Sequence, residues 1–150
     1  MGERAALSHQ QTLRDEGIES VLRLDLVDRK QGQWNDNFTL LDLPVPDAEH
    51  LDGDIIKRAT RFIDTQIASG EAVLVHCNLG VSRSVTVAMA YLIEYEGMSL
   101  AEAFGTVREG RPSAYPHELL LIALIELYDL PYDTSKVFNP KFLAELIKDV

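Results

Sequence analysis

The stretch VLVHCNLGVSRS, residues 73–84, contains the one cysteine of the chain, with a histidine before it and an arginine six positions after it. A cysteine thiolate is a nucleophile. An arginine guanidinium offers a planar fork of donors that can bind two phosphoryl oxygens, and it stays charged at any biological pH. A single cysteine cannot form an internal disulfide or a multi-cysteine zinc site, so this thiol is either a small buried apolar group or a reactive one. The spacing of Cys77 and Arg83 favours phosphate chemistry.

The elements on either side of this stretch would position its side chains. The apolar run AVLVH, residues 72–76, predicts a central strand covered on both faces, and a helix is expected from about Ser84 to Gly97. The tight loop between them would direct backbone N–H groups at one point, where the unpaired groups and the dipole of a helix N-terminus bind an anion. Glycine in this loop permits positive φ angles or a close approach of the ligand. The predicted phosphate-binding loop contains His76, Asn78, Leu79, Gly80, Val81 and Ser82.

Cys77 would lie at the bottom of this positive cradle, which favours its thiolate form and directs it at the bound phosphate. Attack on phosphorus requires a general acid that protonates the leaving group, a contribution of about 10²- to 10⁴-fold. Asp47, in PVPDAEH, is the best candidate, because it lies in a proline-stiffened loop after a strand expected beside the central one; the alternative is a turn-forming Asp after Pro. Asp42 lies within that strand, and Asp52 and Asp54 begin the next helix, where acids usually interact with the helix dipole.

Two further side chains of the stretch have alternative roles. Ser84 could cap the helix, and its hydroxyl could also stabilise Cys77 as a departing thiolate. His76 is expected to hydrogen-bond and orient the loop rather than act as a base. We expect neither a metal nor a cofactor, because no metal-ligand spacing connects the remaining histidines, His9, His50 and His117.

The rest of the chain predicts an α/β fold, a central mostly parallel sheet flanked by helices. We expect a single domain over residues 1–150, because no internal repeat and no linker divides the chain. The expected helices are 8–16, 51–69, 100–109 with Ser99 as cap, 117–128, and a last one that Asn139 caps with Pro140 at its first position. The expected strands before the central one are 18–26 and 38–43, the latter halted by Pro44 and Pro46.

Composition limits the classes of partner. A formal net charge of −10 argues against binding to nucleic acid or to an anionic membrane surface. The 46% hydrophobic content is typical of a soluble globular protein, and no apolar run reaches the roughly 18 residues of a transmembrane helix. The first residues contain no apolar core of signal-peptide length, and Ala6 occupies the position where a myristoylation motif needs Ser or Thr. We therefore expect a cytoplasmic monomer.

HCNLGVSRS resembles the His-Cys-five residues-Arg-Ser signature of cysteine-dependent protein phosphatases, and its ending SRS is similar to the dual-specificity branch. The resemblance extends from LRDEGIESVLRL through LPVPD to MSLAEAFGTVREGRPSAYPH. It implies a mostly parallel sheet with helices on both sides. It also implies that Cys77 is the nucleophile, Arg83 the phosphate clamp, Asp47 the acid and then the base for water, and Ser84 the helper of thiolate departure.

Other branches of the superfamily are less similar to this chain. Low-molecular-weight tyrosine phosphatases have the cysteine near the N-terminus and the acid downstream, and rhodanese-like phosphatases lack an acid in the upstream loop. Large classical tyrosine phosphatases are much longer. The chain also departs from its own branch. Leu79 stands where Ala is common, His117 follows Pro116 where an Asn often braces the phosphate loop, and the usual first strand is missing or abbreviated, as in a minimal enzyme or a fragment.

Three functions fit these observations. The first is a metal-independent phosphomonoester hydrolase that acts on phosphotyrosine, and on phosphoserine or phosphothreonine, in phosphorylated protein substrates. The second is a module of the same fold that binds phosphorylated partners without turnover. The third is a phosphatase for a phosphoinositide, a phosphoglucan or an RNA 5′ end. The net charge of −10 and the absence of lysine from the loop argue against this third function. Arg108 and Arg111 could hold a second phosphate, or could be solvated or paired with carboxylates.

Overall fold

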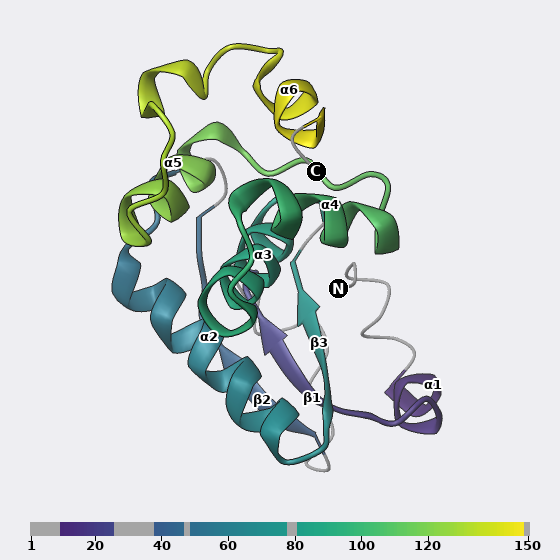
Figure 1. Cartoon of the computed structure of the whole chain (residues 1–150). Helices are drawn as coiled ribbons and strands as arrows, with labels where there is room; N and C mark the ends of the chain where they lie inside the picture. The colour runs from purple at the N-terminus through teal and green to yellow at the C-terminus, as the bar shows by residue number, and fades with distance from the viewer. Residues whose placement is uncertain (1–9, 26–37, 47–48, 78–80, 149–150) are drawn as a thin grey trace.

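The computed structural model describes residues 10–25, 38–46, 49–77 and 81–148. These residues form an α/β fold with a three-stranded parallel sheet flanked by helices, which confirms the predicted class (Figure 1). In chain order the elements are α1 (Gln10–Asp15), β1 (Ile18–Arg23), β2 (Thr39–Asp42), α2 (Gly53–Ala68), β3 (Ala72–His76), α3 (Arg83–Glu96), α4 (Leu100–Gly110), α5 (Glu118–Leu127), η2 (Thr134–Lys136) and α6 (Phe142–Lys148).

The order of strands in the described sheet is β2-β1-β3. The prediction that residues 72–76 form the central strand is therefore wrong for this part of the chain, since β1 lies in the middle. The connection through α2 carries the chain from β2 past β1 to the opposite side of the sheet, where β3 pairs parallel to β1. An apolar run shows that both faces of a strand are covered, but it carries no information about the neighbours of that strand in the sheet.

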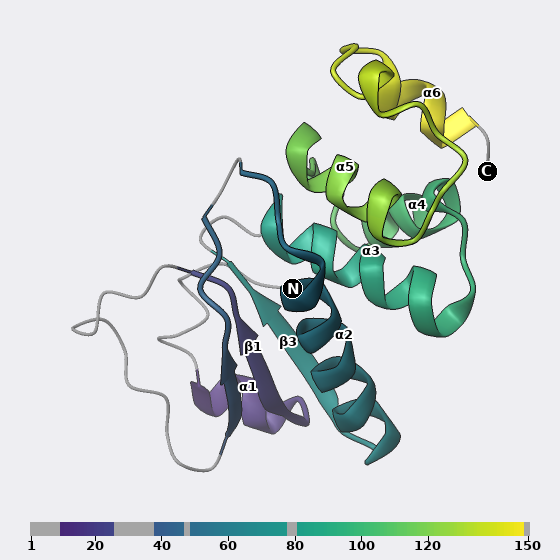
Figure 2. The same ribbon diagram turned by 90° about the vertical axis from the view of Figure 1, so that its left-hand side faces the viewer.

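Alternate residues of the sheet face two separate apolar clusters. Leu22 of β1 and Val75 of β3 belong to the main core, which α2, α3, α4 and α5 complete. Val21 and Leu74 point to the opposite face, where Leu13 of α1 packs against them. Figure 1 shows α1 on one side of the sheet and α2 on the other, and Figure 2 shows β2, β1 and β3 side by side in that order.

The chain after β2 continues to pair with β1, although two prolines follow the strand. The N–H groups of Leu43 and Val45 each donate to a β1-side carbonyl at 3.0 Å. Pro44 and Pro46 occupy the alternate positions, whose N–H groups would face away from β1, so neither proline removes a hydrogen bond of this ladder. The regular strand thus ends at Asp42, ahead of the two prolines as predicted, while hydrogen bonding to β1 continues through Val45. This extension of β2, residues 43–46, places Val45 beside β1 beyond the end of the regular strand.

Side-chain caps account for several helix ends. Asp52 caps α2, and Ser99 accepts a hydrogen bond from the first turn of α4 at 3.1 Å, as its sequence predicted. The side chain of Asn139 accepts from the Lys141 N–H at 2.9 Å, but the regular helix α6 begins only at Phe142. The predicted start of this helix was therefore two residues early, within the usual variation of helix boundaries.

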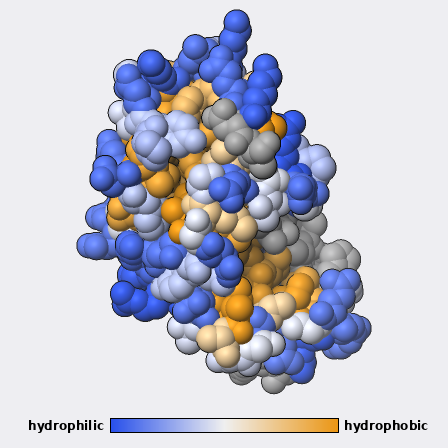
Figure 3. All heavy atoms as spheres, in the orientation of Figure 1, coloured by the Kyte–Doolittle hydropathy of each residue, from blue (hydrophilic) through white to orange (hydrophobic). Residues whose placement is uncertain are grey.

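The largest fully buried side chains include Met89 of α3, Phe104 of α4 and Leu124 of α5. Hydrophilic side chains cover much of the face shown in Figure 3, with apolar atoms in recesses between them. Among the described residues, no helix combines the length and the apolarity needed to cross a bilayer.

Candidate active site

The predicted nucleophile and the residues expected to assist it meet where β3 ends and α3 begins. His76 is the last residue of β3, Cys77 follows it, and Arg83 is the first residue of α3. Cys77 is 2% exposed, and Ser84 is fully buried beside it. The predicted loop residues Asn78, Leu79 and Gly80, and the predicted acid Asp47, lie outside the described residues.

Ser84 contacts the sulfur of Cys77 through two of its groups. The Cys77 thiol donates to the Ser84 hydroxyl, with Sγ and Oγ 3.2 Å apart, and the Ser84 N–H donates to Sγ at 3.5 Å. If Cys77 is a thiolate, the same hydroxyl can rotate and donate to the sulfur. The N-terminus of α3 adds a positive partial charge at this position. The sulfur therefore lies beside a backbone N–H, a rotatable hydroxyl and a helix N-terminus.

The suggestion that Ser84 caps the helix is wrong, because α3 begins one residue earlier and Ser82 occupies the cap position. The Ser82 side chain makes no capping hydrogen bond. Its Oγ accepts instead from the His117 N–H at 3.0 Å. Ser84 lies inside the first turn, so its hydroxyl is available to Cys77.

Arg83 is buried and anchored by the chain at the ends of β1 and β2. Its Nη1 donates to the Val45 carbonyl at 2.9 Å and lies 3.5 Å from the Leu24 carbonyl. Its Nη2 lies 3.3 Å from Oδ1 of Asp25. The guanidinium of the predicted phosphate clamp is therefore held by fixed backbone and by one carboxylate.

Asp25 is the residue of the site that sequence reasoning missed. It follows β1 and is 4% exposed, and its Oδ2 lies 3.6 Å from Nδ1 of His76. The sequence contains one signal for it, an acid between two leucines at the end of an alternating apolar strand, LRLDL. His76 was expected to orient the loop through hydrogen bonds, and at 3.6 Å this carboxylate lies within ion-pair distance of its ring rather than hydrogen-bonded to it.

The segment before α5 braces the start of α3 through its backbone. The Tyr115 N–H donates to the Val81 carbonyl at 2.7 Å, and the His117 N–H donates to the Ser82 hydroxyl. The His117 imidazole caps α5, since its Nδ1 accepts from the Leu119 N–H at 3.1 Å. The departure from Asn to His at this position therefore leaves the described loop residues with two braces, both from main-chain N–H groups.

The other acids considered as candidates have structural partners. Asp42 forms a bidentate ion pair with Arg23, at 2.6 and 2.8 Å. Asp52 caps α2 and accepts from the Asp54 N–H at 2.9 Å. Asp47 remains a prediction from the sequence.

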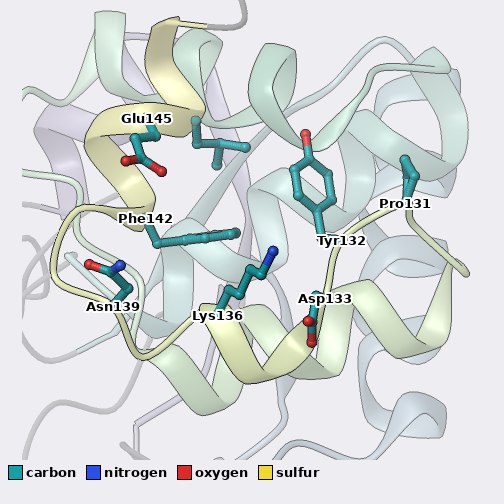
Figure 4. Close-up of a pocket in the computed structure, with 8 residues that line it drawn as sticks. Pro131, Tyr132, Asp133, Lys136, Asn139, Phe142 and Glu145 are labelled. Atoms are coloured by element: carbon teal, nitrogen blue, oxygen red, sulfur yellow. The ribbon is translucent and has the colours of Figure 1, made fainter.

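Two of the hollows outside this cluster lie beside α6. One is adjacent to the bracing segment, between α4 and α6, and has Arg108, Tyr115 and Lys148 in its wall. The other lies between η2 and α6, where Figure 4 shows Tyr132, Lys136 and Phe142 around it. Within the described part of the chain, no three His, Cys, Asp or Glu side chains are grouped as a metal site requires.

Comparison with known proteins identifies the family. The family model for the dual specificity phosphatase catalytic domain matches residues 1–129. The chain is 34% identical over 118 residues to dual specificity protein phosphatase 1B of Arabidopsis thaliana, a match that covers 78% of this chain and 70% of that protein. It covers only 45% of the mouse dual specificity protein phosphatase 12, to which it is 29% identical.

Solved structures show the same fold. The crystal structure of human DUSP28 matches with a TM-score of 0.76 and 27% identity, over 86% of this chain and 90% of that one. The human tyrosine phosphatase-like serine/threonine/tyrosine-interacting protein also matches with a TM-score of 0.76 and 27% identity, over 84% of this chain and 87% of that one.

The brace at Ser82 leads to a test of stability. Ser82→Ala should lower the free energy of unfolding by about 1 kcal/mol, because it leaves the partly buried His117 N–H without its acceptor. Ser69→Ala is the matched control, since that hydroxyl donates at an exposed helix end, and it should change stability by less than about 0.5 kcal/mol. Urea denaturation measures both. Equal effects of the two substitutions would show that Ser82 braces nothing.

Proposed function

Because the chain belongs to the dual specificity phosphatase family, we propose that it hydrolyses phosphotyrosine, and phosphoserine or phosphothreonine, in proteins through a phosphocysteine at Cys77. The observation that carries the proposal is the contact of the Ser84 hydroxyl and amide with the Cys77 sulfur at the N-terminus of α3. A buried structural cysteine has no need of a hydroxyl, an N–H donor and a helix N-terminus around its sulfur. A nucleophile that must also leave as a thiolate requires them.

The reaction has two steps. In the first, the Cys77 thiolate attacks phosphorus, the S–P bond forms as the P–O bond to the substrate breaks, and Asp47 donates its proton to the leaving oxygen. In the second, Asp47 accepts a proton from water, whose oxygen attacks phosphorus. The S–P bond then breaks and releases orthophosphate and the Cys77 thiolate, which Ser84 stabilises. Arg83 binds two phosphoryl oxygens throughout and offsets the charge that develops on them.

The substrates follow from the family and from charge. Phosphorylated proteins are the partners we propose, rather than polyanionic phosphates, because the chain carries a net charge of −10. A catalytic thiol requires a reducing compartment, so we place the protein in the cytoplasm, and we propose that it acts as a monomer.

A binding module without turnover is the second candidate. The structural match to a phosphatase-like interacting protein favours it, since this fold is shared by proteins whose names describe interaction. Against it stands the presence in this chain of Cys77, Ser84 and Arg83 in one buried cluster.

Hydrolysis of an aryl phosphate in EDTA tests the proposal. The native chain should turn over without metal, and Cys77→Ser should abolish turnover, because its hydroxyl is a far weaker nucleophile at neutral pH. Cys77→Ser should still bind inorganic phosphate, which shows that the site remains folded. Phosphate binding by the native chain without turnover would instead establish the binding module.

The acid is tested by leaving-group dependence. Asp47→Asn should lower kcat/KM by about 10²- to 10⁴-fold on phenyl phosphate, whose leaving group needs a proton, and much less on p-nitrophenyl phosphate. The native rate should fall along the basic limb of its pH profile as this carboxyl loses its proton, and Asn, which cannot titrate, should remove that limb. Asp54→Asn, an exposed acid of α2, is the control. Equal losses on both substrates would assign the acid elsewhere.

The role of Ser84 is tested by burst kinetics. Ser84→Ala should slow breakdown of the phosphoenzyme by about 10²-fold, the typical loss when one donor to a developing charge is removed. p-Nitrophenyl phosphate should then release about one equivalent of nitrophenol rapidly, followed by a slow steady state. Ser84→Thr keeps the hydroxyl and should retain most activity. If Ser84→Ala lost the burst as well as the steady-state rate, Ser84 would instead act in the first step, the formation of the phosphoenzyme.

A further inference from the structure

We propose that Asp25 is a positioning residue that holds Arg83 and His76 in place on the two sides of the phosphate-binding loop. The inference rests on the proposed function, in which Arg83 binds the phosphate. The family resemblance in the sequence gives Asp25 no role; its place in the structure does.

One carboxylate serves both sides of the loop. Oδ1 of Asp25 lies 3.3 Å from Nη2 of Arg83, and Oδ2 lies 3.6 Å from Nδ1 of His76. The exposed fraction of the side chain is 6% for Asp25, 10% for Arg83 and 0% for His76. His76 directly precedes the nucleophile, and Arg83 ends the loop. Asp25 itself follows a strand that pairs with β3, so a rigid sheet fixes the carboxylate relative to both partners.

A guanidinium at the end of a long side chain loses rotamer freedom when it binds phosphate, unless the protein has already fixed it. The Arg83 guanidinium is fixed at both of its terminal nitrogens. Nη1 is held by the carbonyls of Val45 and Leu24, and Nη2 is held by Asp25. Among the described residues, no hydrogen bond of Arg83 uses Nε. The edge formed by Nε and the second proton of Nη2 can therefore offer two parallel donors to a phosphate.

The negative charge of Asp25 would by itself repel a phosphate dianion. A carboxylate in this position therefore helps catalysis only through the geometry that it imposes, and otherwise competes with the substrate for Arg83. The backbone anchors favour the first role, because Nη1 is bound to carbonyls of the sheet and its extension, which stay in place whether or not phosphate is bound. The two roles predict opposite changes in phosphate affinity when the charge is removed.

Asp25→Asn is the test, and Asp42→Asn is the matched control. Asp42 pairs with Arg23 in the same sheet, so the control makes the same chemical change in another carboxylate–arginine pair. Asp25→Asn should lower kcat/KM for an aryl phosphate about 10- to 100-fold, the usual loss for a residue that orients a ligand-binding group. It should also weaken competitive inhibition by inorganic phosphate. Asp42→Asn should leave both within about twofold when rates are corrected for the folded fraction.

A double-mutant cycle separates positioning from stability. If Asp25 acts through Arg83, Asp25→Asn should change the rate less than about twofold in the Arg83→Ala background. An equal loss in both backgrounds would show a merely structural role and overturn the proposal, as would tighter phosphate inhibition of Asp25→Asn. If Arg83→Ala itself leaves the rate unchanged, the proposed function of Arg83 fails instead. Should Asp25→Asn not fold, Asp25→Glu keeps the charge, displaces it by one methylene, and carries the same test with the same expected signs.

Discussion

The short link between β3 and α3 is the constraint on which the site depends. It requires a buried strand to end at His76 and a helix to begin at Arg83, close enough for Ser84 in the first turn to reach the sulfur of Cys77 at 3.2 Å. A thiolate in so buried a place would be costly without compensation. In the proposed mechanism the helix N-terminus and the Ser84 N–H and hydroxyl, which contact the sulfur, would offset this cost.

The rest of the described structure holds this link from two directions. From one side, the backbone at Tyr115 and His117 fastens Val81 and Ser82. From the other, the ends of the sheet supply carbonyls and a carboxylate to Arg83. The second support depends on the extension after β2, where prolines alternate with N–H donors and keep the chain beside β1. The segment that follows this short strand thus carries an acceptor, the Val45 carbonyl, for the predicted phosphate clamp.

Local physical chemistry explains which features could be predicted. The capping hydrogen bond of Ser99, the apolar stripe of α2 and the strand–loop–helix arrangement around Cys77 depend on residues close together in the chain. The types of Cys77 and Arg83, which are six positions apart, already indicated phosphate chemistry, because the predicted nucleophile and clamp belong to one loop. Boundaries were less certain, as the one-residue shift at Ser84 and the two-residue shift before α6 show.

The sequence by itself thus determined the α/β class and the family signature, and it predicted the loop and its nucleophile, since periodicity, caps and motif spacing act over a few residues. Only the tertiary structure decided the strand order and the partners of Arg83. Asp25 is 58 residues from Arg83 in the chain, and they meet because the connection through α2 returns β3 to the side of β1 opposite β2. Which distant carboxylate reaches a given guanidinium depends on strand order and register, and these are set by how the whole core packs rather than by any local pattern.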